Sequence, residues 1–266
     1  MSMIGVITLA ATLASSAGSG VDARHSPHLA AAHRADTLRI AIVVDDSAAH
    51  RSLIRGATLG AEEAAHTGVL FGQPVTMIVL GRAAIDPAAR GALRAGLGPA
   101  ASIYIVAGDS TFCSQFMQQS ARPRAPVLDA GCPQATPIEP TVYAIDSRPA
   151  SSAAADGAHL ELWHSSLERF GAEQLNQRFR RRFNEAMDSD AWAGWFATKI
   201  ALDLALHAQA VSHAALLAQL ADPKSSFDGQ KGRPLRFAPP THRLVQPLYR
   251  VVGVGDSSHV VAEVAP

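Results

Sequence analysis

Short apolar runs alternate with longer mixed stretches along the first half of this 266-residue chain. The run LRIAIVV at 38–44 is apolar apart from Arg39 and predicts a strand. Further extended segments are predicted at 74–80, 101–108, 125–131 and 141–147. Helices are predicted between them, at 47–67, about 86–96 and 111–121. Because strands and helices alternate at this spacing, residues 37–147 are expected to form an α/β lobe with a parallel sheet and right-handed crossovers.

The first predicted helix follows the acidic pair Asp45 and Asp46, which ends the first strand. Gly68 is expected to stop this helix at its C-terminal end. The apolar stripe of the helix consists of Leu53, Ile54, Ala57, Leu59 and Ala61. The helix therefore has one side suited to packing against the sheet.

The pattern changes after the fifth extended segment. Residues 148–166 are rich in Ser, Ala and Gly, which predicts a linker with at most one short strand, at 158–163. A basic helix is predicted at 167–186, and a second helix follows from Asp190. An Asp-Gly turn, a short basic strand and a final apolar strand come next, so that residues 167–266 complete the fold. The second helix places its large side chains three or four positions apart: Trp192, Trp195, Phe196, Ile200 and Leu204.

Residues 1–20 are predicted to be an export signal, because an apolar run is followed by small residues that suit cleavage. The run is shorter than the roughly 20 residues that a membrane span needs, so no span is expected in the mature chain. No basic residue precedes the run, and a docked or disordered tail is the alternative. Residues 21–36 look like a polar leader. The 23 basic and 23 acidic residues cancel, which argues against a nucleic-acid partner.

Cys113 and Cys132 are the only cysteines, and both follow predicted strands. Adjacent strand ends can bring two such residues together, so a disulfide is one prediction and two free buried thiols are the other. No C-x-x-C motif is present, which leaves a thioredoxin-like motif or a cysteine zinc ribbon without support.

The closing segment resembles the end of type I periplasmic solute-binding proteins of the Leu/Ile/Val-binding kind. The similarity is greatest to the branch encoded with PQQ-dependent (quinoprotein) alcohol dehydrogenase systems, which ends in a W-A-A-W helix and a K-G-x-P-L-x-F-x-P strand. Gly194 interrupts the first motif. The matching residues are Trp192, Ala193, Trp195, Lys231, Gly232, Pro234, Leu235, Phe237 and Pro239.

Three short motifs in the first half extend the resemblance. They are the helix motif Gly56, Ala57, Gly60 and Ala61, the loop Gly108, Asp109, Ser110 and Thr111, and the loop Asp129, Ala130, Gly131 and Cys132. The resemblance implies a parallel three-layer sandwich. It also implies a second lobe, of which roughly 100 residues are missing from this chain if the usual size of such a domain applies. We therefore expect a reduced second lobe.

In amino-acid-binding relatives, the two matching loops hold the carboxylate and ammonium groups of the ligand. The resemblance therefore makes Ser110, Thr111, Ala130 and Gly131 candidate ligand-binding residues. The alternative is that Ser110 or Thr111 only caps the following helix. Asp45 and Asp46 end the first strand at the same edge and can bind a cation or an ammonium group, although neighbouring carboxylates diverge along an extended chain and capping is the alternative.

The remaining chemical candidates are weak. The arginine cluster of the basic helix can bind a phosphate or an acidic partner, but a solvated face balanced by nearby glutamates is the expected arrangement. The arginines are Arg178, Arg180, Arg181 and Arg182, and the glutamates are Glu168, Glu173 and Glu185. The eleven histidines include His25, His28 and His33 in the leader and His207 and His213 in a late helix, and their spacing supports no metal site. No motif of a nucleotide-binding loop or a nucleophile elbow is present, so neither an enzyme nor a bound cofactor is expected.

The first functional hypothesis is therefore a periplasmic solute-binding component of an ABC transport system linked to quinoprotein alcohol oxidation, which binds a small polar ligand non-covalently. The second is a reused binding-protein scaffold that docks a periplasmic dehydrogenase, a cytochrome or a second copy of itself. A permease is the expected partner under the first hypothesis, and a homodimer is possible under the second.

Overall fold

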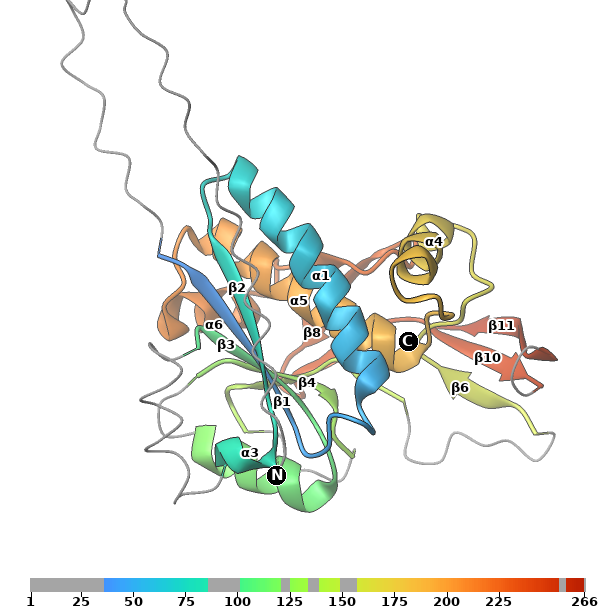
Figure 1. Cartoon of the computed structure of the whole chain (residues 1–266), viewed down its shortest axis with the longest axis horizontal. Coiled ribbons are helices and arrows are strands. Elements are labelled where there is room, and N and C mark those ends of the chain that lie inside the picture. The colour runs from blue at the N-terminus through green and yellow to red at the C-terminus, as the bar shows by residue number, and fades with distance from the viewer. Residues whose placement is uncertain are drawn as a thin grey trace, which may run out of the picture.

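The computed structural model describes residues 36–85, 101–120, 125–133, 139–148, 157–253 and 257–265. The predicted export signal, the leader and the helix predicted at 86–96 lie outside these ranges. Two sheets are present in the described chain, one of eight strands and one of three (Figure 1). The α/β class predicted from the sequence is confirmed.

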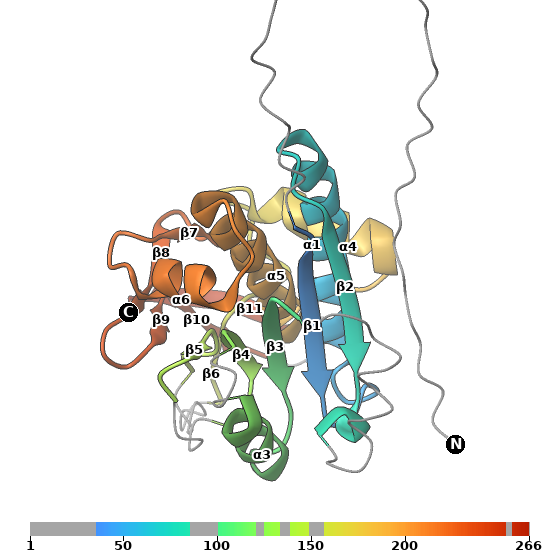
Figure 2. The same ribbon diagram turned by 90° about the vertical axis from the view of Figure 1, so that its left-hand side faces the viewer.

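The first half of the large sheet is parallel, with strands in the order β2-β1-β3-β4-β5 (Figure 2). Its register places Leu38 opposite Val75, and Ile40 opposite Ile103. All five strands fall within predicted segments. They are β1 (Leu38–Val44), β2 (Val75–Leu80), β3 (Ile103–Ala107), β4 (Val127–Gly131) and β5 (Val142–Ala144).

Helices cover both faces of these parallel strands. Ile40 and Ile42 of β1 belong to the core shared with α1 (Arg51–Leu70) and α5 (Ser189–Ala208). The alternate residues Ala41 and Val43 belong to a second cluster, shared with α3 (Ser110–Ser120). Since both faces are buried, the strand sequence is apolar from Ile40 to Val44 rather than alternating. The arrangement is the expected three-layer sandwich.

The large sheet continues beyond β5 with strands from the end of the chain. β9 (Arg243–Val245) is parallel to β5, and β8 (Pro234–Ala238) and β7 (Phe227–Asp228) follow in antiparallel pairs. The predicted basic strand corresponds to β8. The second, small sheet is antiparallel in the order β11-β10-β6. It consists of β11 (His259–Val264), β10 (Leu248–Val252) and β6 (His159–Glu161), and β6 is the short strand predicted within 158–163.

Several predicted helix limits were wrong. α1 begins at Arg51 rather than at residue 47, because Asp46 first makes a turn in which its Oδ1 accepts a hydrogen bond from Ala48 N (2.8 Å). Gly68 does not stop α1, which runs on to Leu70. The basic helix α4 (Ala172–Phe183) is shorter than predicted, because the backbone at Phe170 and Gly171 is left-handed (φ 58° and 88°).

The sequence suggested that the late histidines share one helix, and this prediction was wrong. His207 lies in α5 and His213 begins α6 (His213–Ala221), and Gln209 between the helices has a left-handed backbone (φ 50°). A one-turn 3-10 helix, η1 (Arg82–Ile85), follows β2. Among the described residues, no single helix is long and apolar enough to be a membrane span. Helices α5 and α6 meet both criteria only when they are counted as one segment, and a bend of 102° separates them.

Candidate functional site

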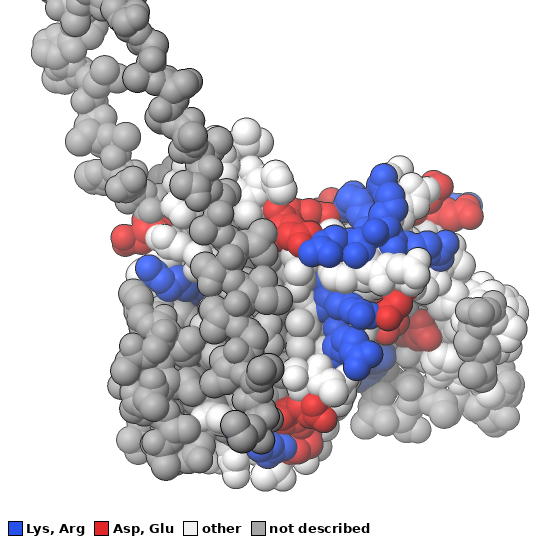
Figure 3. Space-filling view, in the orientation of Figure 1, with Lys and Arg blue, Asp and Glu red and all other residues white. Residues whose placement is uncertain are grey.

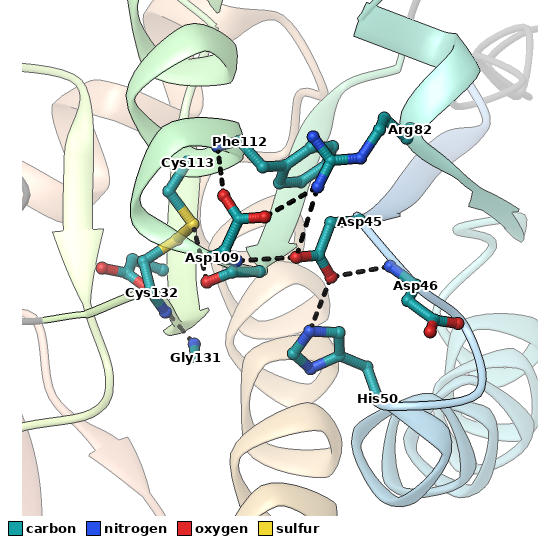
Figure 4. Close-up of a disulfide and its surroundings, with 11 residues drawn as sticks. Asp45, Asp46, His50, Arg82, Asp109, Phe112, Cys113, Gly131 and Cys132 are labelled. Atoms are coloured by element: carbon teal, nitrogen blue, oxygen red, sulfur yellow. Dashed lines mark hydrogen bonds and ion pairs between the residues drawn. A yellow bond between two sulfur atoms is a disulfide. The ribbon is translucent and has the colours of Figure 1, made fainter.

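The carboxyl ends of the parallel strands bring most of the predicted site residues to one edge of the sheet (Figure 4). A disulfide joins Cys113 of α3 to Cys132, just beyond β4, with the two Cα atoms 6.0 Å apart. Of the two arrangements that the sequence left open, the bonded pair is therefore the one found. The bond holds the loop before α3 against the loop after β4, which are the two loops of the predicted ligand site.

Asp45 is the centre of a polar network at this edge. Its Oδ1 accepts hydrogen bonds from Asp46 N (2.6 Å) and lies 2.9 Å from His50 Nε2. Its Oδ2 accepts from Asp109 N (2.7 Å) and lies 3.7 Å from Arg82 Nη2. With its side chain only 12% exposed, Asp45 ties together the ends of β1, β2 and β3. Asp46 is exposed and its carboxylate points away, so the two neighbours form no shared cation site (Figure 4).

Asp109 caps α3. Its Oδ1 accepts a hydrogen bond from Phe112 N (2.8 Å), and its Oδ2 pairs with Arg82 Nη2 at 2.7 Å. The hydrogen bond from Phe112 N, followed by that from Arg82, lowers the pKa of the Asp109 carboxyl. Capping by Ser110 or Thr111, which the sequence offered as the alternative to ligand contact, is therefore not found. Arg82, which also lies 5.4 Å from the centre of the Phe112 ring, was not among the predicted residues, although it follows a strand that ends at the same edge.

Ser110 and Thr111 are exposed at the first turn of α3, and neither hydroxyl has a hydrogen-bond partner within the described ranges. Gly131 lies beside the loop that leads into α3, since its carbonyl accepts a hydrogen bond from Gly108 N at 3.4 Å. Ala130 is different, because it is 1% exposed and belongs to the core. The structure thus brings Ser110, Thr111 and Gly131 to one accessible edge and leaves the Ala130 side chain beneath it.

Asp129 anchors the loop after β4 from below. Its Oδ1 accepts hydrogen bonds from Cys132 N (2.8 Å) and Gly131 N (3.2 Å). Burial raises the pKa of the Asp129 carboxyl to about 7, and the nearby Asp146 carboxylate acts in the same direction. A carboxyl group that titrates near neutrality therefore lies directly under the candidate site.

A second ion-paired group continues the edge beyond β5. Arg148 Nη2 lies 2.6 Å from Asp146 Oδ2 and 3.7 Å from Asp190 Oδ1. Burial raises the pKa of Asp190, and the neighbouring Asp188 adds to this shift. Most charged groups at this edge are thus satisfied by the chain itself. Two surface cavities, of about 380 and 370 Å³, lie elsewhere, one at the β7–β8 hairpin and one between α1 and α4.

The arginines of α4 form a basic surface beside α1 (Figure 3). Arg178 pairs with Glu63 (2.8 Å) and Arg182 with Glu62 (2.9 Å). Arg178 and Arg182 are therefore balanced by glutamates, as expected of the cluster, but these partners come from α1 and not from Glu168, Glu173 or Glu185. Among the residues that the structure describes, no group of three or more His, Cys, Asp or Glu side chains has the arrangement of a metal site.

Comparison with known proteins gives a match in structure alone. No protein-family model matches the chain, and no curated protein matches its sequence. An ABC transporter substrate-binding protein from Sphaerobacter thermophilus has a TM-score of 0.67 at 11% identity, over 86% of this chain and 98% of that one. A periplasmic binding protein from Burkholderia mallei gives 0.67 at 10% identity, over 86% and 95%.

A third similar structure is a branched-chain amino acid transporter substrate-binding protein of Streptococcus pneumoniae, solved with isoleucine, at a TM-score of 0.64, 11% identity and coverage of 87% and 100%. The chain has the fold of these binding proteins. The expected type I periplasmic binding fold is thereby confirmed. Because the sequence identities are only 10–11%, the comparison shows the fold and not the function.

Proposed function

We propose that the chain is an extracytoplasmic solute-binding component of an ABC transport system that binds a small polar ligand without covalent chemistry. The observation that carries this proposal is the exposed hydroxyl pair of Ser110 and Thr111, without partners in the described chain, at the carboxyl edge of a binding-protein fold. In open α/β sheets, ligands collect at this edge, because helix N–H groups and short hydroxyls can hold a polar head group.

The donors left at this edge are hydroxyl groups. Asp109 accepts from the amide of Phe112 and pairs with Arg82 (2.7 Å), whereas the hydroxyls of Ser110 and Thr111 remain exposed. These two hydroxyls can donate hydrogen bonds to the oxygen atoms of a small polar ligand. Asp45, in contrast, is saturated by its own neighbours and acts in this proposal as a support for the loops, not as a ligand.

We also propose that the second lobe is reduced and that the ligand binds without closure of two jaws. In the described chain, the only sheet apart from the large one is the three-stranded antiparallel sheet of β6, β10 and β11. The link to quinoprotein alcohol oxidation rests on the closing residues from Trp192 to Pro239 alone. The periplasmic location rests on the fold and on the export signal proposed for residues 1–20.

A second function is favoured by a different observation. Val69, Leu70 and Phe71 are 56%, 81% and 68% exposed at the end of α1, and exposed apolar patches often mark an interface. The ion pairs at the carboxyl edge would then be purely structural. Under this proposal the chain is an accessory scaffold that docks a periplasmic dehydrogenase, a cytochrome or a second copy of itself.

A binding titration separates the two functions. Calorimetry with organic acids, amino acids and alcohols is expected to find one saturating ligand, and the double variant Ser110→Ala, Thr111→Ala is expected to weaken its binding at least about tenfold through loss of two hydrogen bonds. Thr76→Ala is the matched control, because Thr76 is an exposed hydroxyl residue near the other end of the same sheet. Absence of any ligand, together with sedimentation as a dimer, would replace the first function by the second.

A further inference from the structure

The cavity at the β7–β8 hairpin lies apart from the carboxyl edge and is unused by the proposed function. It has a volume of about 380 Å³ and is lined by Phe170, Phe227, Asp228, Gly232 and Arg233, among others. The hairpin belongs to the closing segment of the sequence, including its Lys231-Gly232 pair. One wall of the cavity comes from this hairpin and the other from Phe170, directly before α4.

The hairpin loop is held in place from beneath. Trp192 of α5 donates a hydrogen bond from Nε1 to Gly229 O (3.1 Å). Lys231 is buried, and its Nζ donates to Gln246 Oε1 (2.7 Å) and Pro247 O (3.1 Å). Because these anchors fix the loop backbone, the remaining loop side chains are presented in a defined arrangement. A pre-organised loop loses little conformational entropy when it binds a ligand.

The opposite wall is an aromatic ring in an unusual position. Phe170 has a left-handed backbone (φ 58°) and is 63% exposed. Its ring lies directly on Gly232, where an added Cβ atom would come within 2.5 Å of the ring carbons. Large exposed aromatic side chains with left-handed backbones are uncommon, and such residues concentrate at binding sites. The Phe170 ring therefore forms one wall of the cavity and remains accessible to a ligand.

The cavity carries one uncompensated negative charge. Arg233 is already neutralised by Glu263, with Nη2 and Oε1 3.2 Å apart. Asp228 accepts a hydrogen bond from Gln230 N through Oδ1 (2.8 Å), and it has no cationic partner in the part of the chain described. A carboxylate facing the same cavity as an exposed aromatic ring is a combination that attracts a positive charge with an apolar surface.

We propose that this cavity binds a small organic cation of the alkylammonium class, with the charge near Asp228 and the alkyl groups against Phe170. This site does not depend on the ligand proposed for the carboxyl edge. An alkylammonium ion suits this cavity better than a metal ion. The Phe170 ring can contribute to binding of an organic cation, whereas a metal ion such as Ca²⁺ needs several oxygen ligands and the cavity offers a single carboxylate.

Choline and its neutral isostere 3,3-dimethylbutanol provide the test. Isothermal titration of the full chain is expected to show one choline site and binding of the neutral alcohol at least about tenfold weaker. Asp228→Asn keeps the acceptor for Gln230 N and removes the charge, so it is expected to reduce choline affinity by a similar factor. Phe170→Leu is expected to weaken choline binding while leaving the charge in place.

Asp222→Asn is the matched control, because Asp222 is also exposed and accepts a hydrogen bond from the amide two residues on, Lys224 N (2.9 Å), outside the cavity. This variant is expected to bind choline as the wild type does. Equal binding of choline and the alcohol, unchanged binding by a folded Asp228→Asn or Phe170→Leu protein, or no choline binding at all would each overturn the proposal. The double variant Ser110→Ala, Thr111→Ala, which should bind the carboxyl-edge ligand more weakly, should bind choline as the wild type does.

Discussion

Glycine residues allow helices α1 and α5 to pack with their backbones almost in contact. A Cβ atom added at Gly56 would lie 1.8 Å from Ala191 O, and one added at Gly194 would lie 2.1 Å from Leu53 O. These distances are far below van der Waals contact, so a side chain at either position forces the helices apart. The G-A-x-x-G-A motif and the glycine within W-A-G-W are thus parts of one helix-packing interface.

Gly194→Ala tests this packing and is informative because it restores the W-A-A-W pattern of the family that the chain resembles. We expect it to lower the free energy of unfolding by roughly 3 kcal/mol, since the new methyl group meets a backbone carbonyl that cannot rotate away. Urea denaturation followed by circular dichroism measures the effect. Gly81→Ala is the matched control and should change stability little, because an added Cβ there has nothing within 4 Å. A fully stable Gly194→Ala protein would show that α5 can shift freely.

At the residue scale, local sequence signals predicted some site residues and missed others for physical reasons. The cysteine pair and Asp45 follow strands, so their common edge could be inferred from the alternation of elements. The capping role of Asp109 was missed, because three consecutive polar residues can each begin a helix and only the backbone path selects one. The aromatic neighbours of Lys231 lie at Trp192 and Tyr249, too far along the chain for a local pattern to reveal.

The pairing of α3 with β4 is the element-scale feature most open to experiment. Their disulfide closes a sequence separation of 19 residues and lies in the core cluster on the α3 face of the sheet. A crosslink of this length restricts the unfolded chain. It therefore stabilises the two loops of the candidate site relative to the reduced protein.

Replacement of both cysteines, as in Cys113→Ala, Cys132→Ala, is expected to lower the free energy of unfolding by about 3 kcal/mol. Urea denaturation with and without dithiothreitol measures this loss. Reductant should destabilise the wild type by a comparable amount and leave the double variant unchanged. Identical unfolding curves for the oxidised and reduced wild type would contradict the role assigned to the disulfide.

At the element scale, burial decides which strands the sequence could predict. β1 is apolar apart from Arg39, and β3 apart from the Tyr104 hydroxyl, because helices cover both faces of these strands. β7 and β9 have two and three residues, too few for a periodic pattern. β11 was missed although Val260, Ala262 and Val264 occupy alternate positions, and nearly all of its residues are exposed. The late start of α4 was missed because the left-handed backbone at Phe170 has no strong residue signal.

Lys231 joins the two sheets of the whole molecule. Its Nζ lies 4.0 Å from the centre of the Trp192 ring in α5 and 5.3 Å from that of Tyr249 in β10. Burial lowers the pKa of the Lys231 amine well below its usual value, whereas contact with two aromatic rings favours the charged form. The desolvation cost of a fully buried ammonium is several kcal/mol and exceeds the roughly 2 kcal/mol of a desolvated cation–π contact, so the lowered pKa is the direction we expect to hold.

Lys231 should therefore make stability depend on pH. In the unfolded chain the amine keeps its proton up to about pH 10.4, while the folded chain loses it at lower pH. The unfolded state then binds more protons between the two pKa values, so the free energy of unfolding must rise with pH across that window. Lys231→Met removes the titration while keeping the length of the side chain. Urea denaturation at pH 7 and pH 10 should show the wild type gaining stability relative to Lys231→Met at the higher pH. A difference between the two proteins that does not change with pH would mean that the aromatic rings keep the buried amine charged, and that a cation–π contact joins the two sheets.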